Sequence, residues 1–277
     1  MGTGKDRQKQ LAREHYQRQA QARLERQRKS RRTALIGTST AVVVVIGAAV
    51  GAVALMGGGD DATATAKPTT AAAEPKAYDP STGTCTYVAS APGEQVKNVG
   101  TPPEKISTAP ATMTIKTNYG DIVATLDSVN APCTVNSFKY LASKDYFDNT
   151  RCHRLGTTFP ILQCGDPLAK ADGKNATDGQ GGPGYRFVDE NLAGAKYNRG
   201  VLAMANSGPA TNGSQFFIVY GETGLSADYT PFGTVTKGLE ILDKVAKRGI
   251  IAGAQNDGTG APKQPVEIKD VTINSKS

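Results

Sequence analysis

The sequence predicts a mainly β domain, a closed barrel with two helical caps, preceded by a single transmembrane helix and a flexible linker. Short segments of alternating apolar residues recur from residue 111 to the C-terminus and are separated by Gly-rich turns, which is typical of a barrel. Only two stretches in this region have the spacing of a helix. An uncharged apolar run near the N-terminus is long enough to cross a bilayer.

Residues 1–33 are expected to form a basic cytoplasmic tail. The first 32 residues hold eleven Lys or Arg and three acids, a net charge of +8, whereas the whole chain carries +7, so the remaining residues sum to −1. Such a density of cations could neutralise several phosphates of a nucleic acid. The tail has almost no aromatic residues and no recognisable nucleic-acid-binding motif. We therefore expect contact with anionic lipid head groups and not with nucleic acid.

Residues 34–56, "ALIGTSTAVVVVIGAAVGAVALM", are predicted to form the transmembrane helix, roughly 35 Å long at about 1.5 Å per residue. The alternative is a cleaved secretory signal, for which "AVA" at 52–54 resembles a cleavage site. That alternative is disfavoured because both the basic region and the apolar run are longer than those of signal peptides. The Lys and Arg residues on the N-terminal flank place the tail in the cytoplasm, so everything after residue 59 is expected outside the cell membrane.

Residues 57–110 are expected to be a linker rich in Gly, Ala, Thr and Pro. A segment with so little apolar surface cannot offset the entropy lost on ordering, so it is interpreted as a tether. One exception is "TCTYVAS" at 84–90, where Cys85 and a short apolar alternation indicate that part of the tether docks.

The folded domain is expected to span residues 111–277. Within it, "MTIKTNYGDIVATLD" predicts two strands around a tight turn. The stretch "APCTVNSFKYLAS" predicts a helix with Pro132 in its first turn, and "GLEILDKVAKR" predicts a second helix. Further strands are predicted in "TRCHRL", "PILQCG", "GVLAMAN", "SQFFIVY", "PFGTVT" and "PVEIKDVTIN".

Five motifs in this domain occur in the order found in one known family: "CHRL", "LQCGDP", "GGPGYRF", "VLAMANSGPATNGSQFFIVYG" and "PFGTV". The chain resembles the cyclophilins, the peptidyl-prolyl cis–trans isomerases, over roughly residues 112–274. Within that family it is similar to the bacterial, membrane-anchored branch. The resemblance implies an eight-stranded antiparallel barrel with a helix at each end and a substrate groove on its outer face.

The chemistry of proline isomerisation explains which residue types such a groove needs. Rotation about an amide is opposed by about 18–20 kcal/mol, because the nitrogen shares its lone pair with the carbonyl. A donor aimed at the prolyl nitrogen withdraws that lone pair, and an apolar pocket holds the proline ring and excludes water. Arginine suits the first role because it is always charged and carries a rigid fork of donors. No bond is broken, so no metal or organic cofactor is expected.

The resemblance assigns roles to four central residues. Arg154 of "CHRL" is the implied catalytic donor, and Phe217 of "QFFI" is the implied floor of the proline pocket. Gln163 and Gln215 are expected to hold Arg154 and the substrate backbone. Phe216, the neighbour of Phe217, is expected in the core because side chains alternate along a strand.

The walls of the groove are also assigned by the resemblance. Ala205 and Asn206 are expected to pair with the peptide main chain, and Phe159, Ile161 and Tyr229 to complete the pocket wall. The segment between Arg154 and Gln163, "LGTTFPIL", is one residue longer than the common form, which leaves open whether Phe159 or Ile161 is misassigned.

Leu225 falls about where many cyclophilins carry a Trp, and this chain has no Trp. In family members the indole N–H donates a hydrogen bond to cyclosporin, which binds in the same groove. Leucine has no donor, so cyclosporin binding is expected to be weak, while proline turnover is expected to persist.

Four cysteines, Cys85, Cys133, Cys152 and Cys164, lie on the expected outer side of the membrane, where disulfides form. No C-x-x-C pair or set of His ligands favours a metal site. Three disulfide pairings are possible. Cys152 with Cys164 would join sequential strands and leave Cys85 to bind Cys133, but strand alternation puts Cys152 and Cys164 on opposite faces unless a bulge intervenes.

Two further features invite other functions and are interpreted as structural. His153 has no Ser or Cys partner for acid–base catalysis. The stretch "GQGGPG" at 179–184 fits a nucleotide-binding pattern but lacks the strand before it and the helix after it. The predicted function is therefore isomerisation of X-Pro bonds in exported, proline-containing polypeptides. The alternative is a module of the same fold that binds proline peptides, or acts as a chaperone, without turnover.

Overall fold

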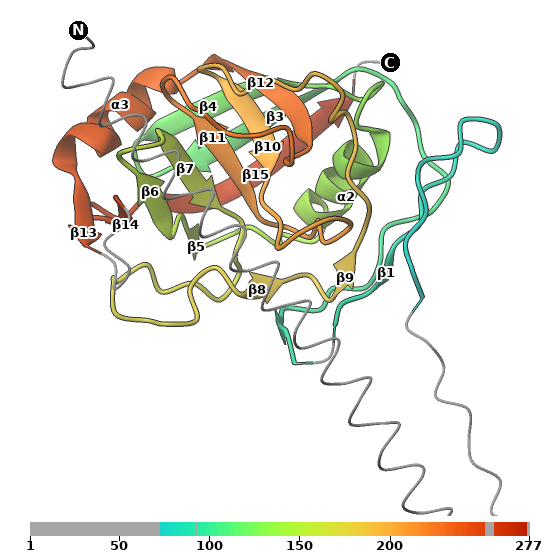
Figure 1. Cartoon of the computed structure of the whole chain (residues 1–277), viewed down its shortest axis with the longest axis horizontal. Coiled ribbons are helices and arrows are strands. Elements are labelled where there is room, and N and C mark those ends of the chain that lie inside the picture. The colour runs from blue at the N-terminus through green and yellow to red at the C-terminus, as the bar shows by residue number, and fades with distance from the viewer. Residues whose placement is uncertain (1–72, 92, 253–257, 276–277) are drawn as a thin grey trace, which may run out of the picture. The chain divides into compact units, whose positions relative to one another are not determined.

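The computed structural model describes residues 73–91, 93–252 and 258–275, and Figure 1 shows their arrangement. The predicted basic tail, the predicted transmembrane helix and residues 57–72 lie outside the described residues. Within those described ranges, neither helix is long and apolar enough to cross a membrane.

The domain is built on one curled antiparallel sheet of eleven strands (Figure 1). The sheet leaves β5 and β13 at its two edges, so it forms a curled half-barrel. In spatial order its strands are β13 (Ile250–Ala252), β14 (Thr259–Pro262), β6 (Arg154–Gly156), β7 (Ile161–Cys164), β11 (Phe216–Val219), β10 (Val201–Met204), β12 (Pro231–Lys237), β4 (Gly120–Leu126), β3 (Ala111–Thr117), β15 (Glu267–Ser275) and β5 (Thr150–Arg151).

The sequence correctly predicts a mainly β domain with two helices, but the sheet differs from the expected closed barrel of eight strands. The stretch "TRCHRL" is not one strand, because Cys152 and His153 interrupt it. The part before the break, β5, pairs with β15, and the part after it, β6, pairs with β7. Strands β13 and β14, which follow the second helix, add two members that the sequence pattern did not predict.

Two helices, α2 (Pro132–Ala142) and α3 (Leu239–Arg248), lie at opposite ends of the curled sheet (Figure 1). Both are where the sequence predicts them, and Pro132 lies in the first turn of α2 as expected. The residue before α2, Ala131, has no side chain that could cap the free backbone N–H groups of that turn. The carboxylate of Glu190, in a loop distant in sequence, accepts hydrogen bonds from these N–H groups instead.

The Glu190 carboxylate caps α2 with three hydrogen bonds. It accepts from the backbone N–H of Cys133 at 3.0 Å, from the N–H of Thr134 at 2.8 Å and from the Thr134 hydroxyl at 2.7 Å. Burial raises the pKa of this carboxyl, and the same hydrogen bonds oppose that rise. Glu190 therefore connects α2 to the loop that precedes β10.

The main core is formed by one face of the sheet together with buried residues of both α2 and α3. Alternate residues of the β3–β4 hairpin point into it, as predicted, and Phe138 of α2 packs on Phe147, Phe216 and Phe232 with ring centroids 4.6–5.6 Å apart. The hairpin residues buried there are Ala111, Met113, Ile115, Ile122, Ala124 and Leu126.

The described part of the expected linker does not behave as a free tether. Its residues 85–91 and 93–98, which we call the strap, run along the domain beside β8 (Gly181–Gly182) and β9 (Tyr185–Arg186). Strand β1 (Val88–Ala89) pairs with β9, and strand β2 (Gln95–Val96) pairs in parallel with β8. The docked segment is thus longer than the "TCTYVAS" stretch, because two short pairings with the domain satisfy its backbone.

Two disulfides join the four cysteines, Cys85 with Cys133 and Cys152 with Cys164. The first ties the strap to α2. The second is possible because the break between β5 and β6 turns Cys152 toward the main core, where Cys164 also lies. The interruption of the strand therefore supplies the bulge that this pairing requires.

We expect Glu190→Ala to lower the free energy of unfolding by about 1–3 kcal/mol, because it leaves buried donors without an acceptor. Urea unfolding of the full-length chain measures the loss. Glu222→Ala, which removes an exposed carboxylate, is the matched control. An equal loss in the two variants would contradict the capping role.

Candidate functional site

Arg154 and Gln163 face each other across two neighbouring strands. They are register partners on β6 and β7, so strand alternation puts both side chains on the same face of the sheet. The Arg154 Nη1 group donates to Gln163 Oε1 at 3.4 Å, and the guanidinium carbon lies 5.2 Å from the centre of the Phe159 ring. Arg154 is half-buried.

Gln215 extends this contact into a ladder of side-chain amides. Gln163 Nε2 donates to Gln215 Oε1 at 2.9 Å, and Gln215 Nε2 donates to the backbone carbonyls of Gly179 and Gly181, each at 2.9 Å. An amide has two N–H donors, and those of Gln215 both bind the Gly-rich loop. Gln215 thus holds Gln163 directly and holds Arg154 indirectly, through Gln163.

Phe217 lies on the opposite face of β11 from the main core. Phe216 belongs to that core, as alternation predicts, whereas Phe217 belongs to a second apolar cluster. The buried members of this second cluster are Ile161, Tyr197, Ala203, Phe217 and Val219. Phe217 is only 2% exposed, so its ring forms the base of the cluster and not its rim.

Two tyrosines border Phe217. The Tyr229 ring meets it edge-on with centroids 5.5 Å apart, and the Tyr197 ring lies 6.2 Å away. Tyr197 donates its O–H to the Tyr229 carbonyl at 2.7 Å and accepts the Tyr229 N–H at 2.9 Å. Burial raises the pKa of Tyr197, so the phenol stays protonated and keeps donating.

Sequence reasoning missed Tyr197 because nothing in the pattern marks it. It is a single aromatic in the irregular stretch "NLAGAKYNRG", between β9 and β10, where neither helical nor strand periodicity applies. Its role is visible only in the packing, where it positions the backbone of Tyr229.

Phe159 and Ile161 both reach the second cluster. Ile161 is 4% exposed and lies within the cluster, and the partly buried Phe159 packs against it beneath the Arg154 guanidinium. The extra residue in "LGTTFPIL" therefore does not remove either side chain from this face.

Ala205 and Asn206 follow β10 at the edge of the cluster. The Ala205 N–H donates to the Gln215 carbonyl at 2.9 Å, so any pairing of this residue with a peptide has to use its carbonyl. The Asn206 side chain donates to the Asp228 carbonyl at 2.8 Å and accepts the Gly208 N–H at 3.2 Å. Asn206 thus ties its own loop to the residues just before Tyr229.

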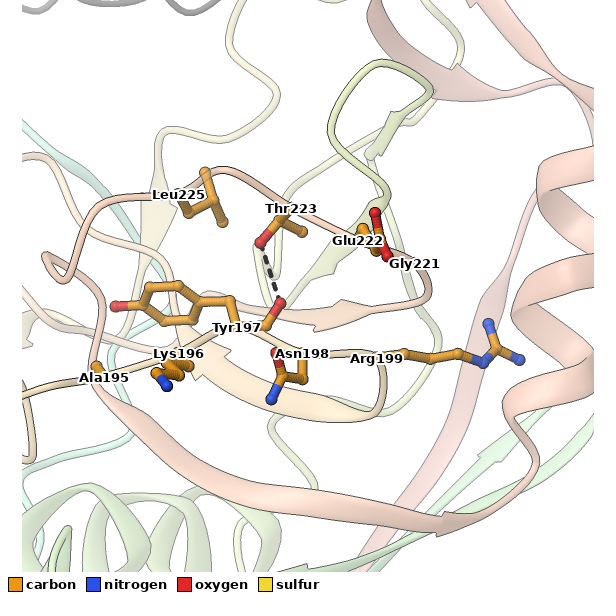
Figure 2. A pocket seen from close by; sticks show the side chains of 9 residues that line it. All are labelled: Ala195, Lys196, Tyr197, Asn198, Arg199, Gly221, Glu222, Thr223 and Leu225. Atoms are coloured by element: carbon orange, nitrogen blue, oxygen red, sulfur yellow. Dashed lines mark hydrogen bonds between the residues drawn. The ribbon is translucent and has the colours of Figure 1, made fainter. Parts of the chain in front are cut away.

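A hollow of about 600 Å³ continues from the second cluster (Figure 2). Leu225 and Tyr197 belong to both, and Thr223 donates its hydroxyl to the Tyr197 carbonyl at 3.0 Å across it. Arg199 forms one wall and is fixed by an ion pair with Asp243 at 2.8 Å. Neither Arg154 nor Gln163 lines the hollow. The hollow therefore lies beside the candidate site and does not contain its charged donor.

His153 is buried next to Arg154. Neither of its ring nitrogens has a hydrogen-bond partner among the described residues, and burial lowers its pKa to about 4. The ring is therefore neutral at neutral pH, and no carboxylate accepts a hydrogen bond from it as in a catalytic dyad. In the part of the chain that the structure describes, no group of three or more His, Cys, Asp or Glu side chains could hold a metal ion.

The site as a whole offers a fixed, charged donor beside an apolar cluster. Its donor, Arg154, is positioned by Gln163 and Gln215, and its apolar floor is Phe217 with Phe159, Ile161 and Tyr229 around it. Such a site can polarise a neutral group held against the aromatic rings.

These features place the chain in a known class of proteins. Residues 112–273 match the sequence profile of the family described as cyclophilin type peptidyl-prolyl cis-trans isomerase/CLD. The match covers more than half of the 277 residues, so the chain belongs to the cyclophilin family, as its motifs predict.

Two curated bacterial relatives are named probable peptidyl-prolyl cis-trans isomerase B. The protein from Mycobacterium leprae is 44% identical over 187 residues, which cover 61% of this chain and 60% of the relative. The one from Mycobacterium tuberculosis H37Rv is 41% identical over 208 residues, covering 69% and 64%. The chain thus spans less than two thirds of the length of either relative.

Solved structures share the same fold. A cyclophilin type peptidyl-prolyl cis-trans isomerase of Cryptosporidium parvum is 33% identical with a TM-score of 0.52, covering 61% of this chain and 99% of that one. A second structure of that protein, in the presence of the dipeptide Ala-Pro, is 33% identical with a TM-score of 0.51, covering 60% and 99%.

Proposed function

We propose that this chain accelerates cis–trans rotation about X-Pro bonds, with Arg154 as the donor to the prolyl nitrogen. The observation that carries the proposal is the fixed guanidinium of Arg154 beside the Phe217 cluster, held through Gln163. The relative determined in the presence of Ala-Pro supports proline-containing peptides as the substrate class.

The mechanism requires no bond to break, only a lower barrier to rotation. As the X-Pro bond twists, the nitrogen lone pair leaves conjugation and becomes a hydrogen-bond acceptor. A donor in place at that moment stabilises the twisted state more than either planar state, which is the condition for catalysis. The apolar cluster around Phe217 holds the ring and excludes water, so the donor acts in a medium of low polarity.

The amide ladder restricts the conformations of the Arg154 side chain, as donation to the prolyl nitrogen requires. A long, freely moving side chain would lose entropy each time it reached the nitrogen. Gln163 and the ring of Phe159 restrict the guanidinium before substrate arrives, so less of that cost falls on the reaction.

The chain also fits the bacterial, membrane-anchored branch of the family, with exported polypeptides as its substrates. The basic residues before the apolar run 34–56 support an anchor with the catalytic domain outside the cell. The pairing of all four cysteines in disulfides supports an oxidising compartment.

We expect Arg154→Ala to lower kcat/KM at least about tenfold, or roughly 1.4 kcal/mol of transition-state stabilisation. A protease-coupled or NMR-exchange assay on the full-length chain measures it, with circular dichroism to show that the variant is folded. Arg151→Ala is the control, because Arg151 is an exposed arginine on β5, the strand that precedes β6 in the sequence. Wild-type turnover in Arg154→Ala would refute the mechanism. If the unmutated chain bound proline peptides tightly but did not turn them over, the result would favour a binding module or chaperone.

We expect cyclosporin to inhibit this isomerase poorly. On binding, a carbonyl of the drug loses its hydrogen bond to water, and Leu225 has no donor that could replace it. The unpaired carbonyl costs about 1–3 kcal/mol, roughly a ten- to hundredfold loss of affinity. Leu225→Trp should tighten inhibition with little change in kcat/KM, as measured by titration of the drug. Equal inhibition of both forms would show either that Leu225 does not occupy the position of the family's Trp or that this hydrogen bond contributes little to affinity.

We expect protease added to intact cells to remove the catalytic domain and leave a membrane-embedded N-terminal fragment. The reason is the charge asymmetry around residues 34–56. Immunoblotting with an N-terminal tag detects the fragment. Recovery of the intact domain from the medium, beginning near residue 55, would support a cleaved signal peptide instead.

A further inference from the structure

The strap reaches the loop that supports the amide ladder. Strand β2 pairs with β8 in the register Gln95 to Gly181 and Val96 to Gly182, and the Lys97 N–H donates to the Gly182 carbonyl at 3.0 Å. Gly181 is also one of the two residues whose carbonyls accept from Gln215. The strap is therefore one peptide unit away from a hydrogen bond of the ladder.

The Gly179–Gly182 loop is held from three directions. Asp166, a buried carboxylate, accepts the N–H of Gly179 at 2.7 Å and the N–H of Gly181 at 3.1 Å. Gln215 binds both carbonyls, and β2 covers the remaining side. A Cβ added at Gly181 would lie 2.0 Å from Asp166 Oδ1, so the backbone is packed directly against the carboxylate.

The strap is attached to the domain at both of its ends, independently of its pairing with the Gly179–Gly182 loop. The Cys85–Cys133 disulfide fixes its N-terminal end to α2. At its other end Lys97 Nζ donates to the Tyr146 carbonyl at 2.9 Å and lies 5.2 Å from the centre of that ring. Tyr146 in turn shares a 3.0 Å hydrogen bond with Ser214, the residue before Gln215.

We propose that strand β2 of the strap is a positioning element for the catalytic Arg154, acting through Gly181, Gln215 and Gln163. This inference rests on the proposed function, because it assumes that Arg154 is the catalytic donor. The effect of the strap is to keep the Gly181 carbonyl where Gln215 can donate to it.

The physical reason lies in the weakest link of the ladder. The Arg154–Gln163 hydrogen bond is 3.4 Å long, near the limit at which such a bond holds a side chain, whereas the next two links are 2.9 Å. A small shift of the Gly181 carbonyl frees Gln215 to rotate, which lets Gln163 turn away from Arg154. Catalytic groups tolerate displacements of only about 0.5 Å, so a loosened loop should cost turnover before it costs folding.

The test compares Lys97→Pro with Lys97→Ala in the full-length chain. Both variants lose the ammonium that binds Tyr146, but only proline also removes the N–H that pairs with Gly182. We expect Lys97→Pro to lower kcat by about three- to tenfold relative to Lys97→Ala, the effect of one lost positioning hydrogen bond, with KM unchanged. Thermal unfolding of both variants shows whether they are folded.

A double variant separates positioning from general damage. If the strap acts through Arg154, Lys97→Pro has no further effect on kcat in an Arg154→Ala background, because the group it positions is absent. An equal loss of kcat in both backgrounds overturns the proposal, as does wild-type kcat in Lys97→Pro. If Arg154→Ala itself keeps wild-type turnover, the proposed function fails, whereas a failure of Lys97→Pro alone leaves that function intact.

A second variant keeps the proposal testable if Lys97→Pro does not fold. Replacing Cys85 and Cys133 together by Ala frees the strap at its other end and leaves the sequence of β2 and β8 unchanged. We expect a loss of kcat in the same direction, absent in the Arg154→Ala background. Unchanged kcat in this variant would also overturn the proposal.

Discussion

The arrangement of the site depends on the amide ladder, which runs from Arg154 on β6 across β7 to the residue before β11. Gln163 on β7 joins Arg154 on β6 to Gln215, which immediately precedes β11. Hydrogen bonds between side chains are individually weak, but in a row each one restricts the rotamers of the next. The ladder ends on the backbone carbonyls of Gly179 and Gly181, which have less rotational freedom than side chains. The conformation of the Arg154 side chain is thereby restricted by the backbone.

The sequence allowed much of this to be predicted, for reasons that differ from element to element. The β3–β4 hairpin and both helices follow from periodicity, because each has one apolar face that has to be buried. Strand alternation predicts that Phe216 and Phe217 lie on opposite faces, and the family motif decided which of the two belongs to the groove. The positions of Arg154 and Gln163 came from motifs, but their contact is a property of strand register, which the sequence does not state.

What could not be predicted arises from contacts between distant segments. The break at Cys152 and His153 has no local signal, since both residues fit an extended strand, and it becomes visible only when Cys152 meets Cys164 in the core. The capping of α2 by Glu190 and the packing of Tyr197 join residues from irregular loops, where neither spacing nor composition indicates a partner. The stretch "GQGGPG", which formally fits a phosphate-binding pattern, instead supplies carbonyls to Gln215. Of its glycines, Gly181 packs directly against Asp166, where a Cβ would lie 2.0 Å from the carboxylate oxygen.

The disulfide between the strap and α2 also decides how the domain bears mechanical load. A pull on the chain ahead of Cys85 passes through the covalent bridge to Cys133, which is 48 residues further along the sequence. The intervening loop, which contains β1, β2 and the β3–β4 hairpin, is bypassed by the tension. Backbone hydrogen bonds in short pairings are easily sheared, whereas a covalent bridge is not. While the bridge is intact, the contacts that reach the amide ladder are therefore insulated from forces transmitted along the N-terminal chain.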